Sequence, residues 1–319
     1  MSRRPSRVWS GTIGGDASMV ITSGNQPARA AASSDWHVCK EIARAHGRSF
    51  FLASQCLPGD RRRAIHATYA YCRLADDLID HPGDNGIEAA TSALDRWEAE
   101  LDWPRHPVAV AFADARASYG VPVTPARELI TGLRMDLSDM TYQNWPDLRR
   151  YCHYVAGTVG LLVAPILGCS DPNALPRAAT LGIAMQLTNI LRDIAEDAER
   201  GRLYLPLDEI DAFGCDPEAI LAGRPGARFR ELMAFQIERA RGLYAEAHPG
   251  VSSLAPAGRL ATLAASQFYA GILTEIERLD YDVFRARARV PTSRKIRAMP
   301  AVTAGFMSLA MRRPSGLVS

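Results

Sequence analysis

Residues 186–206, QLTNILRDIAEDAERGRLYLP, determine the fold prediction more strongly than any other stretch of the chain. Apolar residues recur there every three or four positions, which is the period of an amphipathic helix. Asp193 and Asp197 are four residues apart, so they lie on one face of that helix, with Asn189 one turn earlier. The stretch therefore predicts a helix that carries an acidic face into apolar surroundings.

A second acidic stretch, YAYCRLADDLID at residues 69–80, repeats the arrangement. Asp76 and Asp80 share one helix face, with Arg73 and Tyr69 on the turns before them. Two carboxylates one turn apart repel each other unless a positive group lies between them. A single pair of this kind is typical of a solvated helix surface, whereas two pairs with apolar flanks favour a shared function.

Aspartate oxygens and an amide oxygen are ligands that Mg²⁺ prefers, and Mg²⁺ usually combines one or two carboxylates with substrate phosphates. Carboxylates from two helices therefore indicate a metal-bridged diphosphate. Three arginines, Arg48, Arg73 and Arg192, are candidates for charge-assisted contacts to its oxygens. Loss of a diphosphate from an allylic carbon makes a carbocation, and an apolar helical pocket would exclude the water that quenches it.

The rest of the chain fits one helical domain. It has 319 residues, of which 47% are hydrophobic and 23% charged, and its 37 basic residues nearly balance 35 acidic ones. This near-neutral charge and the lack of a recognisable DNA- or RNA-binding motif argue against a nucleic-acid partner. Helical periodicity with breaks at proline and glycine predicts an all-α fold. The clearest helical stretches are Arg62–Ile79, Ile87–Glu100, Ala178–Ala198 and Phe229–Ala247.

Three regions are expected along the chain: a disordered basic tail at 1–34, a helical domain at 35–305 and a C-terminal tail at 306–319. The first region is also compatible with an organelle transit peptide. Six scattered cysteines without a Cys-x-x-Cys pair favour free thiols in a reducing cytoplasm.

An uncharged stretch between Arg150 and Asp171 is long enough to span a bilayer. Polar and small residues interrupt it, so we interpret it as a core helix that lines a cavity. Its glycines, Gly157 and Gly160, are expected to let an apolar ligand approach closely.

Together these motifs resemble the squalene and phytoene synthases, the head-to-head prenyltransferases. The resemblance covers roughly residues 36–300 and rests on both acidic stretches and on HGRSF (46–50), YCHYVAGTVG (151–160) and GRLYLP (201–206). The stretch IERLDYDVF (276–284) resembles bacterial phytoene synthases more than squalene synthases. The implied fold is the helical class I isoprenoid synthase fold, with a central apolar cavity.

The resemblance also implies roles for individual residues. Metal ligands would be Asp76, Asp80, Asn189, Asp193 and Asp197. Substrate contacts would be His46, Gly47, Arg48, Ser49, Phe50, Tyr69, Arg73, Tyr151, Gln186, Arg192 and Tyr269. The residues most directly involved in catalysis would be Tyr69, Arg73, Asp76, Asp80 and Asp193. Arg202 and Tyr204 are interpreted as closing a loop.

The implied reaction joins two geranylgeranyl diphosphates into phytoene through prephytoene diphosphate, for carotenoid biosynthesis. It would use Mg²⁺, with Mn²⁺ as an alternative ion, and no NADPH. An enzyme of the same family that makes a C30 product is an alternative, since pocket depth is not evident from sequence. A non-catalytic helical assembly factor is a more distant one, disfavoured by the intact acidic motifs.

One departure from the family pattern lies after residue 284, where Arg285 and Arg287 flank Ala286 instead of forming a basic pair. Arg294 or Lys295 could supply the charge that faces the diphosphate. The same basic strip could attract anionic lipid headgroups. We therefore expect a cytoplasmic enzyme that associates peripherally with a membrane and can contact downstream carotenoid enzymes.

Overall fold

The computed structural model describes residues 29–80, 86–138 and 141–311, and these residues contain helices and no strand. The predicted all-α fold is confirmed. The helices are α1 (Ser33–His46), α2 (Arg48–Ser54), α3 (Gly59–Asp80), α4 (Gly86–Ala99), α5 (Pro107–Tyr119), α6 (Thr124–Met135), α7 (Trp145–Cys152), α8 (Thr158–Ile166), α9 (Leu175–Glu199), α10 (Leu207–Ala212), α11 (Pro217–Leu221), α12 (Phe229–Ala247), α13 (Pro256–Arg278) and α14 (Thr292–Met311). Three shorter elements complete them: the π-helix η1 (His153–Gly157) and the 3₁₀-helices η2 (Pro172–Ala174) and η3 (His248–Ser253).

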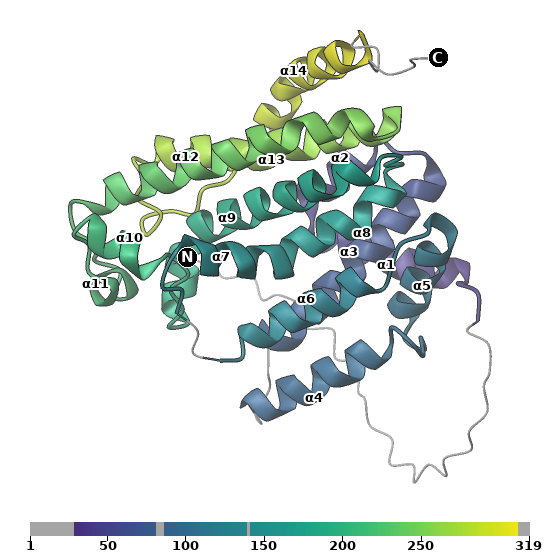
Figure 1. Cartoon of the computed structure of the whole chain (residues 1–319), viewed down its shortest axis with the longest axis horizontal. Helices are drawn as coiled ribbons and strands as arrows, with labels where there is room; N and C mark the ends of the chain where they lie inside the picture. The colour runs from purple at the N-terminus through teal and green to yellow at the C-terminus, as the bar shows by residue number, and fades with distance from the viewer. Residues whose placement is uncertain (1–28, 81–85, 139–140, 312–319) are drawn as a thin grey trace, which may run out of the picture.

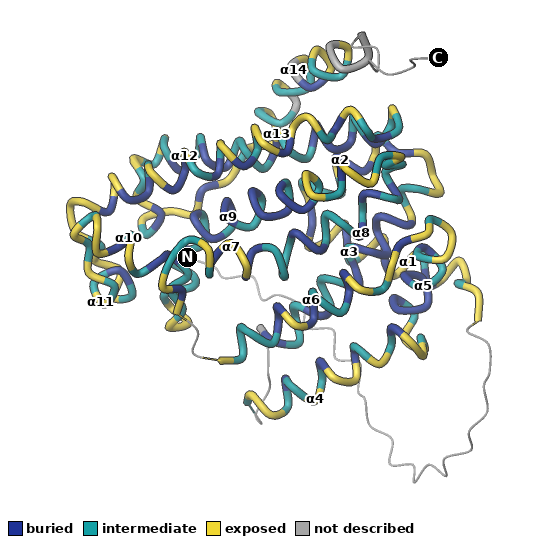
Figure 2. Tube along the Cα trace, viewed as in Figure 1, coloured by how far each residue is buried: buried dark blue, intermediate teal, exposed yellow. Residues whose placement is uncertain are grey.

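Helix α9 is central to the arrangement. It lies between α12 and α13 on one side and the α7–η1–α8 run on the other, while α6 and then α4 follow further out (Figure 1). Burial follows the same order, because α9 is mostly buried or half-buried and α4 is largely exposed on its outer face (Figure 2). The helix that carries the second acidic stretch is therefore packed on several sides.

Glycines allow this central packing. A Cβ atom at Gly160 would lie 2.2 Å from the carbonyl oxygen of Ala178, and one at Gly182 would lie 2.1 Å from that of Ala156. Such distances leave no room for a side chain, so the backbones of α9 and of the η1–α8 run are in direct contact. Gly160 also lines an internal cavity, as expected for this run, whereas Gly157 is not among the described residues that line it.

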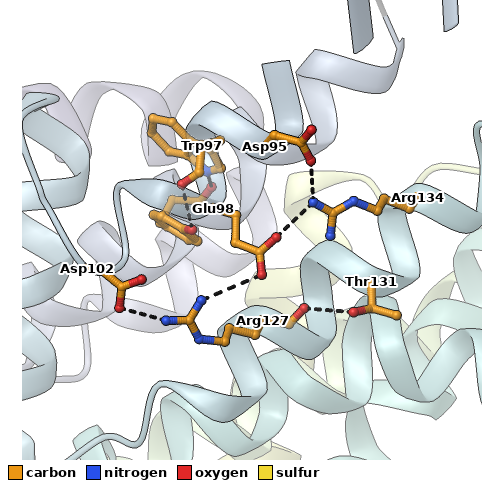
Figure 3. Close-up of polar contacts among 8 residues, drawn as sticks. Asp95, Trp97, Glu98, Asp102, Arg127, Thr131 and Arg134 are labelled. Atoms are coloured by element: carbon orange, nitrogen blue, oxygen red, sulfur yellow. Dashed lines mark hydrogen bonds and ion pairs between the residues drawn. The ribbon is translucent and has the colours of Figure 1, made fainter. Parts of the chain in front are cut away.

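Helix α4 is held to α6 by charged side chains (Figure 3). Arg134 of α6 donates to Asp95 at 2.6 Å and to Glu98 at 2.8 Å, and Arg127 donates to Asp102 at 2.6 Å. Isolated pairs of this kind contribute little at the surface, and a network contributes more. The periphery thus relies on ion pairs where the centre relies on backbone contact.

The ends of the predicted domain are only partly covered by the structure. Residues 1–28 of the expected N-terminal tail lie outside the described residues, and α1 begins at Ser33. At the other end α14 continues to Met311, so the boundary expected at residue 305 lies within a helix. Within the described part of the chain, no helix is both long and apolar enough to cross a membrane. All six cysteines are described and free.

Candidate functional site

An apolar cavity of about 240 Å³ lies between α2, α3, α8, α9 and α13. Most of its lining is aliphatic, including Leu57, Ile65, Val159, Val163, Leu167, Leu181, Met185, Val251 and Leu254. Polar side chains line it as well: Tyr69, Gln186, Asn189 and Tyr269, and also Ser54, Arg177 and Thr262. Tyr69 on α3 and Gln186 and Asn189 on α9 belong to the two acidic stretches, so one polar end of the cavity lies beside both motifs.

Tyr69 is held in place at this end by Gly47 and by α2, which follows it. Its ring stacks on Phe50 with the centroids 4.9 Å apart. A Cβ atom at Gly47 would lie 2.6 Å from the same ring, so a side chain there would displace it. Burial raises the pKa of the Tyr69 hydroxyl, and the nearby Tyr269 adds to the effect. The predicted contacts Gly47, Phe50, Tyr69 and Tyr269 thus share one site, with Tyr69 neutral.

The first acidic stretch forms its ion pairs within α3. Arg73 donates to Asp76 at 3.0 Å and also to Asp77, three and four residues further along the helix. The Arg73–Asp76 pairing agrees with the shared face expected from the spacing. Asp77 is an additional partner that the sequence analysis did not assign. The backbone of Asp80 ends α3, and its side chain lies outside the described residues.

The second acidic stretch recruits a distant residue. Asp193 pairs with its neighbour Arg192, whose Nε atom donates at 2.7 Å, and with Arg287 at 2.8 Å. Arg287 also pairs with Glu196 at 3.0 Å. Arg287 belongs to the segment between α13 and α14, where the family's basic pair is interrupted by Ala286. Its guanidinium therefore faces the second motif, a position that its spacing alone did not predict.

Two further groups on α9 have the chemistry of metal ligands. The Oδ1 atom of Asn189 is buried and has no hydrogen-bond partner among the described residues. Burial raises the pKa of Asp197 to about 7, and the negative charge of Asp193 adds to this shift. An amide oxygen without a donor and a carboxylate that is costly to ionise are both satisfied by a cation.

The segment HGRSF (46–50) contacts α14 through Ser49. Lys295 donates from Nζ to Ser49 Oγ at 2.7 Å. Burial lowers the pKa of Lys295, and the positive charge of Arg48 lowers it further, which indicates that the two cations face a common space. Of the two alternatives named for the missing basic residue, Lys295 reaches this segment, whereas Arg294 pairs with Glu275. His46 is exposed at the end of α1.

Tyr151 lies beside the site and not in the cavity wall. It is 3% exposed, and it is absent from the described residues that line the cavity. Its hydroxyl donates to Asp136 Oδ2 at 2.8 Å, and Tyr204 donates to Asp136 Oδ1 at 3.0 Å. Asp136 lies outside both acidic motifs, so sequence analysis missed it. Tyr204 does more than close a loop, because its hydroxyl takes part in this cluster.

These residues fit a divalent cation that is shared with a substrate. Among the described side chains, which exclude that of Asp80, no three His, Cys, Asp or Glu residues converge as a complete metal site. Mg²⁺ keeps several water or phosphate ligands and needs only one or two carboxylates from the protein. The unpartnered Asn189 oxygen and the half-buried Asp197 carboxylate are ligands of the right chemistry.

Known proteins share both the sequence and this architecture. Residues 43–294 match the family described as squalene/phytoene synthase. The chain belongs to the squalene/phytoene synthase family. It is 41% identical to a phytoene synthase of Arthrospira platensis over 286 residues, which cover 84% of this chain and 92% of that protein. It is 43% identical to the chloroplastic phytoene synthase 1 of Arabidopsis thaliana over 82% of this chain, although the match spans 64% of that relative.

Solved structures of squalene/phytoene synthases share the fold. A crystal structure of a dehydrosqualene synthase in complex with ligand aligns with a TM-score of 0.80 at 30% identity, and covers 86% of this chain and 97% of its own. The squalene synthase HpnC from Alicyclobacillus acidocaldarius aligns with a TM-score of 0.71 at 31% identity, over 78% of this chain and 95% of its own. The resemblance inferred from the motifs is therefore confirmed.

Proposed function

We propose that this protein joins two geranylgeranyl diphosphates head to head into phytoene, without NADPH, as a step of carotenoid biosynthesis. The observation that carries the proposal is the mainly apolar cavity, one polar end of which lies beside both acidic motifs. Tyr69 lines the cavity one turn before Arg73, and Asn189 lines it one turn before Asp193. A prenyl chain fits inside the cavity while its diphosphate stays with the charged groups.

The length of the cavity favours a C20 chain. Its lining along α9 runs from Arg177 to Asn189, a distance of about 18 Å at the rise of an α-helix. The sixteen main-chain carbons of a geranylgeranyl group extend roughly 19 Å, against roughly 14 Å for the twelve of a farnesyl group, if bonds of about 1.5 Å advance in a zigzag. The names of the phytoene synthase relatives support the same substrate.

The metal ligands would be Asp76, Asp80, Asn189, Asp193 and Asp197. Mg²⁺, or Mn²⁺ in its place, supplies positive charge that stabilises the departing diphosphate. Diphosphate oxygens would be bound from the protein side by Arg48, Arg73, Arg192, Arg287 and Lys295. Ser49, held by Lys295, can donate its hydroxyl to the same group.

The remaining residues control the carbon chemistry. The C1–O bond of one substrate breaks, and its allyl cation bonds to the double bond of the second substrate. Loss of a proton then closes the cyclopropane ring of prephytoene diphosphate. A second ionisation, rearrangement and proton loss give phytoene, and two diphosphates are released. The aliphatic lining excludes water from both cations, and the faces of Tyr69 and Tyr269 can stabilise them.

Mass spectrometry of the product tests the proposal. The purified protein would be incubated with Mg²⁺ and either geranylgeranyl or farnesyl diphosphate, without NADPH. We expect a C40 hydrocarbon with a conjugated triene from the first substrate. A C30 hydrocarbon or an accumulating cyclopropyl diphosphate from farnesyl diphosphate would replace the C20 assignment, and no diphosphate release from either would favour an assembly factor.

Peripheral membrane association is part of the proposal. Arg285 and Arg289 before α14 and Arg297 in its first turns are exposed, and Met307 is exposed further along the helix. This combination of basic and apolar residues suits an anionic bilayer surface, where each basic residue contributes about 1 kcal/mol. Sedimentation with anionic vesicles at low salt should carry the protein down, and neutral vesicles should not.

A further inference from the structure

Asp136 is a carboxylate that needs an explanation. It follows α6 directly, at the negative end of that helix's dipole, where a further negative charge is unfavourable. Both of its oxygens nevertheless accept hydrogen bonds from buried or half-buried tyrosines, Tyr151 at 2.8 Å and Tyr204 at 3.0 Å. The rings of the two tyrosines stack with centroids 5.3 Å apart. The unfavourable position of this carboxylate is therefore offset by hydrogen bonds from groups that come from other segments.

The groups around Asp136 connect it to the end of the second acidic motif. Tyr204 lies in the turn that follows α9, and the backbone N–H of Arg202 in that turn donates to the carbonyl of Asp197 at 2.9 Å. The guanidinium of Arg202 donates to the carbonyl of Asp136 at 3.4 Å. One chain turn therefore touches Asp136 on one side and Asp197 on the other.

We infer that Asp136 is a positioning residue for the second metal-binding motif. Its carboxylate fixes the hydroxyl of Tyr204, Tyr204 fixes the turn at residues 201–206, and that turn fixes the end of α9 that carries Asp197. Asp136 is absent from the described residues that line the cavity, so it acts through these contacts and not on the reacting carbons. The inference rests on the proposed function, because that function makes Asp197 a metal ligand.

Metal binding without turnover provides the direct test. Mn²⁺ would be titrated into the full-length protein with inorganic pyrophosphate and no isoprenoid, and free Mn²⁺ would be followed by electron paramagnetic resonance. Asp136→Asn keeps the size of the side chain and removes its charge. We expect it to weaken Mn²⁺ binding about 10- to 100-fold, as removal of a group that orients a metal ligand usually does. Asp95→Asn, which removes an ion pair of α4 remote from α9, is the matched control and should bind Mn²⁺ like the wild type.

A second variant tests the route through Tyr204 and keeps the inference falsifiable if Asp136→Asn does not fold. Tyr204→Phe removes one hydroxyl and retains the ring, so it should weaken Mn²⁺ binding in the same way. Combining it with Asp136→Asn should add little, because both changes break one chain of contacts. Wild-type Mn²⁺ affinity in Asp136→Asn or in Tyr204→Phe would overturn the inference, as would a wild-type protein that binds no Mn²⁺ with pyrophosphate.

The outcomes separate this inference from the proposed function. A wild-type protein that binds Mn²⁺ and pyrophosphate but makes no phytoene would contradict the proposed reaction and leave the role of Asp136 testable. A wild-type protein that makes phytoene, with variants that bind Mn²⁺ normally, would contradict the role of Asp136 alone.

Discussion

The two acidic motifs have similar spacing but are built differently. On α3, Arg73 pairs with Asp76 and Asp77 of its own helix, and these carboxylates are 42% and 30% exposed. On α9, Asp193 is 18% exposed and pairs with Arg287 from beyond α13, while Asp197 is half-buried near the end of the helix. The first motif is a local arrangement, whereas the second exists only once several segments have packed around α9.

The strongest way to break this comparison is to remove a carboxylate from the second motif. We expect Asp193→Asn to lower kcat by more than about 100-fold, beyond the range seen for groups that only orient a ligand. The change removes a metal ligand and also leaves Arg192 and Arg287 with a weaker acceptor. Steady-state release of diphosphate from geranylgeranyl diphosphate measures the effect.

Asp77→Asn is the control from the first motif, since Asp77 also pairs with an arginine but is not expected to bind metal. Its kcat should stay within a few-fold of the wild type. If kcat fell equally in Asp193→Asn and Asp77→Asn, the loss of ion pairs would explain both effects, and the assignment of Asp193 as a metal ligand would be contradicted.

The helices of the two motifs also differ in how their stability depends on pH. Helix α3 carries His66, which is 3% exposed, while α9 contains no histidine. The pKa of His66 is lowered to about 4, mainly by burial and also by the positive charges of Arg62 and Lys40. The unfolded chain takes up this proton near pH 6.5, so the stability contributed by the neutral ring is complete above pH 6.5 and falls as the pH drops towards 4.

His66→Gln should remove this pH dependence. Because the unfolded chain binds this proton at pH 5 and the folded protein does not, the free energy of unfolding of the wild type should be about 2 kcal/mol lower at pH 5 than at pH 8. Urea unfolding at both pH values therefore should show a smaller loss of stability in the variant by about that amount. His37→Gln removes an exposed histidine and should reproduce the wild-type loss. If His66→Gln lost as much stability between pH 8 and pH 5 as the wild type, His66 would not be the cause of the pH dependence.

A glycine-to-alanine pair sharpens the comparison at the level of packing. Gly182→Ala places a methyl group 2.1 Å from the carbonyl oxygen of Ala156, and this overpacking should destabilise the protein by about 1–3 kcal/mol. Gly59→Ala, at the start of α3, meets no atom within 4 Å and should leave the Tm unchanged or slightly higher. Differential scanning calorimetry compares the two, and a small effect of Gly182→Ala would show that α9 can shift without cost.

Local patterns predicted much of this molecule. The helices around both motifs, the Arg73–Asp76 pair and the cavity contacts Tyr69, Gln186 and Tyr269 follow from helical spacing and from the resemblance to a family. Apolar residues spaced three or four positions apart indicate which face of a helix is buried. Residues within one or two turns of each other are therefore accessible to sequence analysis.

Contacts between distant segments were not accessible in the same way. Asp136 lies at the end of α6, and neither its spacing nor its neighbours in sequence distinguish it from a surface acid. Arg287 reaches Asp193 because of the path taken between α13 and α14. The close backbone contacts at Gly160 and Gly182 depend on which segment lies opposite, so the sequence alone did not predict them.

The π-helix η1 changes the phase of the helical run that contains Tyr151 and Gly160. In an uninterrupted α-helix, nine residues turn through about 900°, which would place these two residues on opposite faces. The wider turn at His153–Gly157 takes back about the rotation of one residue and leaves them on adjoining faces. A single run of chain can therefore direct Tyr151 towards Asp136 and Gly160 towards the cavity. A helical wheel drawn for a regular α-helix over residues 145–166 would therefore place Tyr151 and Gly160 on opposite faces.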